Sequence, residues 1–240
     1  MTILRTVYWY VYFAVSLLFK TPELNKVRKQ KNNMEQREYE ALINKVVVKW
    51  AKKQIRNSGA RIKVAGEENI PKEHVLFVSN HQSNFDIAVF IACINKDKGF
   101  IAKTEMLKIP LLRDWMTELR CVFMDRSDIK KSAKAILEGI EILKSGYSMV
   151  VFPEGTRSKG NTLGEFKAGS FKLATKSGVP IVPVTIDGTY KIMEENNNKI
   201  KPADVNVTIH KPIYVNALSK EELTALPEKV KEIIESKLKA

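Results

Sequence analysis

From Ala60 to the end of the chain, short apolar runs alternate with segments of helical periodicity, and this alternation constrains the fold most. Seven runs have the length and composition of buried strands, at residues 61–64, 75–79, 99–103, 121–124, 149–152, 181–186 and 205–210. Helices are predicted at residues 84–95, 111–119, 128–144 and 169–177. The pattern predicts an α/β fold in which helices flank a single mixed sheet on both faces.

Prolines mark two places where this pattern is expected to be irregular. The segment VPIVPV, residues 179–184, contains Pro180 and Pro183, which favour an edge or irregular strand because proline donates no ladder hydrogen bond. A last helical region opens at the capping box Ser219-x-x-Glu222, and we expect Pro227 to interrupt it.

The first 57 residues have the pattern of a helical hairpin. Residues 6–19 carry no charge, are rich in aromatic side chains, and are bracketed by Arg5 and Lys20. This run is short for a membrane span and suits an interfacial or re-entrant segment. A signal peptide is rejected because Lys20-Thr21-Pro22 offers no small-residue cleavage site. The alternative is a helix buried within the protein.

A basic, proline-containing link at residues 20–31 leads to a second, amphipathic helix that ends at Gly59. Its apolar stripe consists of Tyr39, Leu42, Ile43, Val46, Val47 and Trp50. Lysines opposite this stripe suit a helix that lies in an anionic membrane surface. The alternative is a surface helix packed on the core. We therefore expect residues 1–57 to bind a membrane and residues 58–240 to form the α/β domain.

The net charge of +13 predicts an anionic partner. Nucleic acid is disfavoured because the basic residues concentrate in the N-terminal hairpin and no recognition motif is present. Cys93 and Cys121 are the two cysteines, so no disulfide framework is expected. No zinc-ligand spacing and no H-E-x-x-H motif occur, so no metal site is expected either.

The segment Asn80-His81-Gln82-Ser83-Asn84-Phe85-Asp86 joins a predicted strand to a predicted helix. With Ser83 as the N-cap, Asp86 falls in the first turn of that helix. The imidazole of His81 and the carboxylate of Asp86 then lie close together, as a general base and the group that orients it. The alternative is a capping box, Ser83-x-x-Asp86, with a purely structural histidine.

Basic residues end three further strands, at Lys103, Arg126 and Arg157. Ligand groups gather at such strand ends in α/β sheets, and guanidinium groups bind phosphate oxygens in pairs. The alternative for Arg157 is a surface ion pair with Glu154 or Glu165. A nucleotide-binding loop is rejected because the position that needs lysine is Asn161.

Four stretches follow one another along the chain: NHQSNFD at 80–86, VFMDR at 122–126, FPEGTRS at 152–158 and VPIVPV at 179–184. In this order they resemble the motifs of the glycerophospholipid acyltransferase family, in particular its 1-acyl-glycerol-3-phosphate acyltransferases. The resemblance implies that His81 is the base and Asp86 its partner. It places around the acceptor phosphate Arg126, Glu154, Gly155, Thr156, Arg157 and Lys103. The chain departs from the family at Cys121, where glycine is usual.

The resemblance implies transfer of a fatty acyl group from acyl-coenzyme A or acyl carrier protein to the sn-2 hydroxyl of lysophosphatidic acid, which gives phosphatidic acid. No cofactor beyond this co-substrate is expected. The enzyme would act at a membrane, on its cytoplasmic face. Another acceptor, glycerol-3-phosphate or a different lysophospholipid, is the alternative within the family. A non-catalytic protein that binds anionic membranes or nucleic acid is the alternative outside it.

Overall fold

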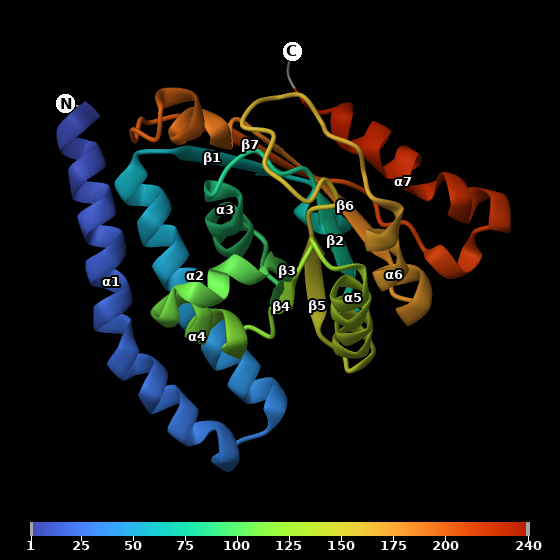
Figure 1. The fold of residues 1–240 in the computed structure, drawn as a ribbon, viewed down its shortest axis with the longest axis horizontal. Helices are drawn as coiled ribbons and strands as arrows, with labels where there is room; N and C mark the ends of the chain where they lie inside the picture. Colours follow the sequence, from blue (N-terminus) through green and yellow to red (C-terminus); the bar gives the residue numbers. More distant parts are fainter. Residues whose placement is uncertain (1, 239–240) are drawn as a thin grey trace.

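The computed structural model describes residues 2–238, in which seven strands form one sheet (Figure 1). The strands are β1 (Arg61–Ala65), β2 (Leu76–Ser79), β3 (Lys98–Lys103), β4 (Val122–Met124), β5 (Ser148–Val151), β6 (Ile181–Asp187) and β7 (Asp204–Ile209). Their order is β1-β7-β6-β2-β5-β3-β4, and neighbours are parallel except for the antiparallel pair β6 and β7. The predicted single mixed sheet is confirmed.

Helices cover both faces of the sheet. They are α1 (Thr2–Gln30), α2 (Gln36–Ser58), α3 (Phe85–Cys93), α4 (Pro110–Glu118), α5 (Ile129–Lys144), α6 (Lys172–Ser177) and α7 (Lys220–Glu235). Successive strand side chains point to opposite faces, so Phe77 packs with α1 to α4 while Leu76 and Val78 pack with α5 to α7. The central strand β2 is buried throughout because both of its faces are covered, which explains its uninterrupted apolar run.

Pro183 lies in a central strand, so the predicted edge position is wrong. β6 is paired with β2 on one side and β7 on the other, and its residues are all buried. The carbonyl of Pro183 accepts the His210 N–H at 2.9 Å, and His210 is the residue that follows β7. The next pairing on this side is the bridge between Ile181 and Ile213. The Pro183 position, which has no N–H, therefore lies between these two pairings, and β6 tolerates a proline there.

Two other prolines lie inside continuous helices, contrary to prediction. α1 runs from Thr2 to Gln30 through Pro22, so the predicted link at residues 20–31 is mostly helix. α7 likewise continues through Pro227, and its predicted capping box at Ser219 and Glu222 is present. Proline removes one intrahelical bond, but tertiary packing of the rest of a helix outweighs that loss. In α7 the packing residues are Leu226, Val230 and Ile234, which are fully buried.

The apolar stripe of α2 faces the protein core, as the alternative interpretation stated. Tyr39, Ile43, Val46 and Val47 are buried in the same core cluster as α3 residues. Trp50 donates from its indole to the Ser16 hydroxyl of α1 at 2.9 Å. The hairpin and the sheet therefore share one core on this side of the molecule, and α2 lies between α1 and α3 in Figure 1.

The apolar surface that remains exposed in the hairpin belongs to α1. Its exposed large apolar residues are Ile3, Leu4, Val7, Tyr8, Tyr10, Val11, Val15, Leu18 and Phe19. Within residues 2–238, the helical segment Thr2–Asn33 is the one with the length and composition that membrane crossing requires, and most of its apolar window is not buried. Whether residues 1–57 bind a membrane stays a prediction.

Candidate active site

The four parallel strands β2, β5, β3 and β4 are neighbours in the sheet, so their carboxyl ends lie along one edge. His81 follows β2, Arg157 follows β5 and Arg126 follows β4, while Lys103 is the last residue of β3. The chain therefore brings these four residues to the same edge of the sheet. Cys121 precedes β4 and lies at the opposite end of that strand.

The imidazole of His81 and the carboxylate of Asp86 are hydrogen-bonded, with Nδ1 and Oδ2 2.7 Å apart. The Asp86 side chain has no exposed surface, and Oδ2 also accepts the backbone N–H groups of Gln82 and Ser83. Its other oxygen, Oδ1, accepts the hydroxyl of Thr189. An ionised carboxylate is only an acceptor, so Nδ1 carries the proton and Nε2 keeps its lone pair.

The helix that carries Asp86 begins one residue later than predicted. Asn84 is the N-cap of α3, and Asp86 is the second helical residue. Ser83 still contributes, because its hydroxyl accepts the Phe85 N–H at 3.0 Å. The two interpretations of Asp86 are compatible, since one carboxylate both accepts N–H groups at a helix start and orients an imidazole.

The turn after β5 holds His81 in place. Its ring stacks on Phe152, with centroids 4.2 Å apart and an interplanar angle of 21°. The N–H of His81 donates to Glu154 Oε1 at 2.7 Å, and its carbonyl accepts the Ser158 N–H at 2.8 Å. The His81 side chain is 18% exposed, and nothing within residues 2–238 hydrogen-bonds to Nε2. Nε2 is therefore available to a substrate proton.

Glu154 supports the loop of His81 with both carboxylate oxygens. Oε1 accepts the His81 N–H, and Oε2 accepts the Gly164 N–H at 2.8 Å. Burial raises the pKa of Glu154, and these backbone hydrogen bonds act in the opposite direction. Glu154 therefore supports the loop that carries His81, and its predicted place around the acceptor phosphate stays a prediction.

Arg157 is paired with a carboxylate that sequence reasoning missed. Its Nη1 lies 3.0 Å from Glu194 Oε1, and the Glu194 side chain is only 2% exposed. Neither Glu154 nor Glu165, the partners considered from the sequence, forms this ion pair. Part of the guanidinium charge is thus already neutralised by the protein.

Arg126 and Lys167 are two cations that meet at Gly155. A side chain at Gly155 would bring its Cβ within 3.2 Å of Lys167 Nζ and 3.6 Å of Arg126 Nη1. Gly155 has a φ of +75°, which glycine adopts without strain. Within residues 2–238 neither cation has an ion-pair partner. Burial lowers the pKa of the Arg126 guanidinium. Two unpaired cations beside one point are an arrangement that can bind an anion.

Two other predicted site residues, Lys103 and Thr156, have exposed side chains. Lys103 is exposed and forms an ion pair with Glu105. Thr156 is exposed in the turn that follows Gly155. Three residues of the site, Lys167, Thr189 and Glu194, carried no sequence signal, because none lies in a recognisable motif. No group of three metal-binding side chains occurs within the part of the chain that is described.

Comparison with known proteins identifies relatives over most of the chain. The family model described as Acyltransferase matches residues 61–187. The chloroplastic 1-acyl-sn-glycerol-3-phosphate acyltransferase BAT2 of Brassica napus is 41% identical over 154 residues, which cover 63% of this chain and 44% of that protein. The 1-acyl-sn-glycerol-3-phosphate acyltransferase of Borreliella burgdorferi is 34% identical over 173 residues, which cover 70% of this chain and 69% of that protein. The chain thus spans less than half of the Brassica protein.

One solved structure is similar over nearly the whole chain. It is the crystal structure of the 1-acyl-sn-glycerophosphate (LPA) acyltransferase PlsC from Thermotoga maritima. The TM-score is 0.84 at 32% sequence identity, and the match covers 98% of this chain and 93% of that one. The similarity therefore extends over the N-terminal hairpin as well as the sheet.

Proposed function

This chain belongs to the Acyltransferase family, and from that premise we propose that it transfers a fatty acyl group to the sn-2 hydroxyl of 1-acyl-glycerol-3-phosphate. The donor is a thioester, acyl-coenzyme A or acyl carrier protein, and the product is phosphatidic acid. The observation that carries the proposal is the buried pair of His81 and Asp86, whose free Nε2 lies on the same sheet edge as the unpaired cations at Gly155. The names of the relatives support the acceptor.

His81 acts as the general base. Its Nε2 takes the proton of the acceptor hydroxyl while that oxygen attacks the thioester carbonyl. Asp86 accepts the Nδ1–H throughout and stabilises the imidazolium that forms. The tetrahedral intermediate then expels a thiolate, and the imidazolium returns the proton to it. A thiol has a pKa of about 8.5, so this leaving group needs little assistance. No acyl-enzyme is required, and the chain has no G-x-S-x-G motif.

Arg126 and Lys167 hold the phosphate of the acceptor. Both cations lie within 4 Å of the point where a Cβ at Gly155 would stand, and within residues 2–238 neither forms an ion pair with a carboxylate. Arg157 is the weaker candidate because Glu194 already neutralises part of its charge. Holding the phosphate fixes the distance from the headgroup to the hydroxyl, which presents that hydroxyl to His81.

We expect Lys167→Ala and Arg126→Ala each to raise the KM for lysophosphatidic acid by about 10- to 100-fold, since a charge-assisted hydrogen bond contributes about 1.5–3 kcal/mol. The KM for the acyl donor is expected to change less than threefold. Initial-rate kinetics with each substrate varied in turn check both values. Lys172→Ala is the matched control, because Lys172 is an exposed lysine at the start of α6. An unchanged acceptor KM in both variants would show that the acceptor phosphate does not bind at this site.

The element that binds the membrane surface is α1. Its exposed apolar residues bury area in the boundary between headgroups and acyl chains, and the positive charge of the chain attracts anionic lipid. Such a position gives the site access to a lipid acceptor that does not leave the bilayer. We propose that the protein acts at the cytoplasmic face, where the acyl donors are found.

Replacing Val7, Val11 and Leu18 together by glutamine is expected to weaken binding to vesicles that contain anionic lipid by at least about tenfold, since each exposed side chain loses about 1–2 kcal/mol of apolar transfer. Co-sedimentation with liposomes measures the effect. These substitutions are preferable to deletion of residues 1–57, which would remove buried residues of α2 from the core. Ile129→Gln with Leu137→Gln on α5, across the sheet from α1, is the control. Equal binding by all three proteins would show that α1 is not the contact.

A thiol-release assay tests the proposed reaction directly. Acyl-coenzyme A and acyl carrier protein are each offered with and without lysophosphatidic acid, and release that depends on the acceptor is expected for at least one donor. The same assay with glycerol-3-phosphate or another lysophospholipid in place of lysophosphatidic acid tests the alternative acceptors. Release with no acceptor preference, or no release at all, would contradict the proposal and favour a non-catalytic binding protein.

A further inference from the structure

The segment after β6, residues 189–200, runs along the sheet edge that carries His81, and we call it the arm. It contains two short 3₁₀ helices, η5 (Thr189–Ile192) and η6 (Glu194–Asn196). At its start, the Thr189 hydroxyl donates to Asp86, and the N–H of the preceding Gly188 donates to Gln82 at 2.9 Å. None of the four sequence motifs includes the arm, yet its first residue touches the carboxylate that orients the base.

Glu194 in the middle of the arm joins two parts of the site. Its Oε2 accepts the hydroxyl of Ser83 at 2.6 Å, and its Oε1 accepts the backbone N–H of Asn84 at 3.0 Å. The same Oε1 lies 3.0 Å from Nη1 of Arg157. One nearly buried carboxylate therefore ties the loop between His81 and Asp86 to the turn that follows β5. The proposed chemistry does not use this carboxylate.

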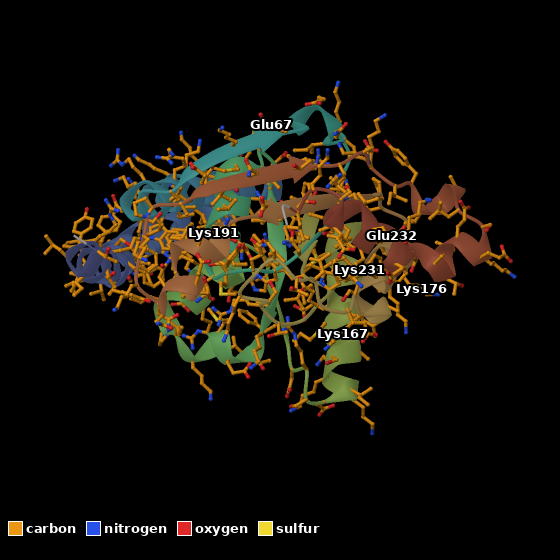
Figure 2. The ribbon with its side chains drawn as sticks, turned by 90° about the horizontal axis from the view of Figure 1, so that it is seen from above. Glu67, Lys167, Lys176, Lys191, Lys231 and Glu232 are labelled. Atoms are coloured by element: carbon orange, nitrogen blue, oxygen red, sulfur yellow. The ribbon has the colours of Figure 1, made fainter. Side chains whose placement is uncertain are left out.

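The far part of the arm is held by α1. The Tyr10 hydroxyl contacts Met193 Sδ at 3.4 Å and donates to the Asn198 carbonyl at 3.2 Å. The backbone N–H of Ile200 donates to the Thr6 hydroxyl at 2.9 Å. Figure 1 shows the arm, in orange, beside the upper end of α1, and Figure 2, turned by 90°, places Lys191 of the arm on the α1 side of the molecule.

A second contact from α1 reaches the site without the arm. The ring of Trp9 lies 5.0 Å from that of Phe85, the first residue of α3 and the neighbour of Asp86. Met193 is buried in the same cluster as both rings. The helix with the exposed apolar face thus packs directly on the residues that surround the catalytic pair.

We propose that Glu194 is a positioning residue for acyl transfer and that α1 holds it in place through the arm. This inference rests on the proposed function. Glu194 keeps Ser83 and Asn84 in the conformation that lets Asp86 orient His81, and it fixes the direction of Arg157. A shift of α1 against the domain would move Met193 and Asn198, which flank Glu194 and its turn. The position of α1 against the domain is thereby coupled to the orientation of His81.

The first test is kinetic. Glu194→Ala is expected to lower kcat by on the order of 10- to 100-fold, as misplacement of a catalytic group does. The KM for the acyl donor should stay within threefold. Glu194→Gln retains a carbonyl oxygen for Asn84 and an amide that can donate to Ser83, so it should recover most of kcat. Glu195→Gln is the control, since Glu195 is exposed on the same turn. A merely structural residue would lower the folded fraction and leave kcat per folded molecule unchanged.

The second test asks whether α1 acts through Glu194. Tyr10→Phe removes only the hydroxyl that reaches the arm, and it should lower kcat by about fivefold, which corresponds to the loss of one hydrogen bond of about 1 kcal/mol. The same change in the Glu194→Ala background should have no further effect, because coupled residues are not additive. Tyr12→Phe is the control on the same helix, because the Tyr12 hydroxyl forms no hydrogen bond within residues 2–238. Independent, additive losses would overturn the coupling.

Hydrogen exchange decides the inference without reference to turnover. The amides of residues 82–86 are expected to exchange faster in Tyr10→Phe and in Glu194→Ala, but not in Tyr12→Phe or Glu195→Gln. Unchanged exchange in Tyr10→Phe would overturn the proposal, whatever the activity. If the wild-type protein releases no thiol from either donor, the proposed function fails, and the exchange data still show whether α1 holds the loop of His81.

Discussion

His81→Ala is expected to lower kcat for acyl transfer by about 10³-fold or more, because no other group in the site can take the proton of the acceptor hydroxyl. Both Glu154 oxygens are engaged by backbone N–H groups, and Asp86 faces away from solvent with its acceptor sites filled. The KM for lysophosphatidic acid should change little, since the cations at Gly155 do not depend on the imidazole. Steady-state kinetics and a thermal unfolding curve on the same preparation measure both effects.

His74→Ala is the matched control for this prediction. His74 lies beside Gly146 at the other end of the sheet, ahead of β2 and β5, so its substitution should leave kcat unaltered. Removal of the His81 ring also removes its stacking on Phe152 and its hydrogen bond to the buried Asp86, so we expect a lower melting temperature in a protein that still folds. Turnover within tenfold of wild type in a folded His81→Ala protein would show that another group is the base.

Asp86→Asn is expected to lower kcat by about 10²- to 10⁴-fold, the range seen when the acid that orients a catalytic histidine loses its charge. Asparagine can still present one oxygen to Nδ1–H and to the N–H groups of Gln82 and Ser83. Its amide then faces the Thr189 hydroxyl, which can accept a hydrogen bond as well as donate one. The loop geometry is thereby preserved while the negative charge that stabilises the imidazolium is lost.

Thr189→Val separates the charge of Asp86 from the packing around it. This substitution removes one hydrogen bond to Oδ1 and leaves the carboxylate ionised, so kcat should fall less than about tenfold. Rates for both variants, measured at several pH values against wild type, distinguish the two effects. If Asp86→Asn and Thr189→Val lose the same amount of activity, the carboxylate serves the helix start and not the imidazole.

The sheet could be predicted from the sequence because its strands are nearly continuous apolar runs. β2, β5 and β6 are buried on both faces, and such runs are short, bounded and unlike the helices between them. The prolines were the main source of error. Pro22, Pro183 and Pro227 each break a local rule, and in each case the packing of the whole element decided the outcome.

The role of α2 was predictable only as a pair of alternatives. An apolar stripe opposite lysines is the same pattern whether the stripe faces lipid or a protein core. The decision depends on what lies across from Tyr39 and Ile43, and that is α3 and the sheet, which are distant in the chain. α1 differs from α2 in this respect, because most of its apolar residues are exposed.

What the sequence by itself determined is the pairing of His81 with Asp86, because the two are five residues apart and one strand-to-helix turn places both. The alternation of strands and helices likewise determined which residues end parallel strands and meet at one edge. Only the tertiary structure decided which distant residues surround that pair. Glu194 reaches Arg157 across 37 positions, and Thr189 reaches Asp86 across 103. Contacts at such separations depend on how whole elements pack, and no local pattern of residues records them.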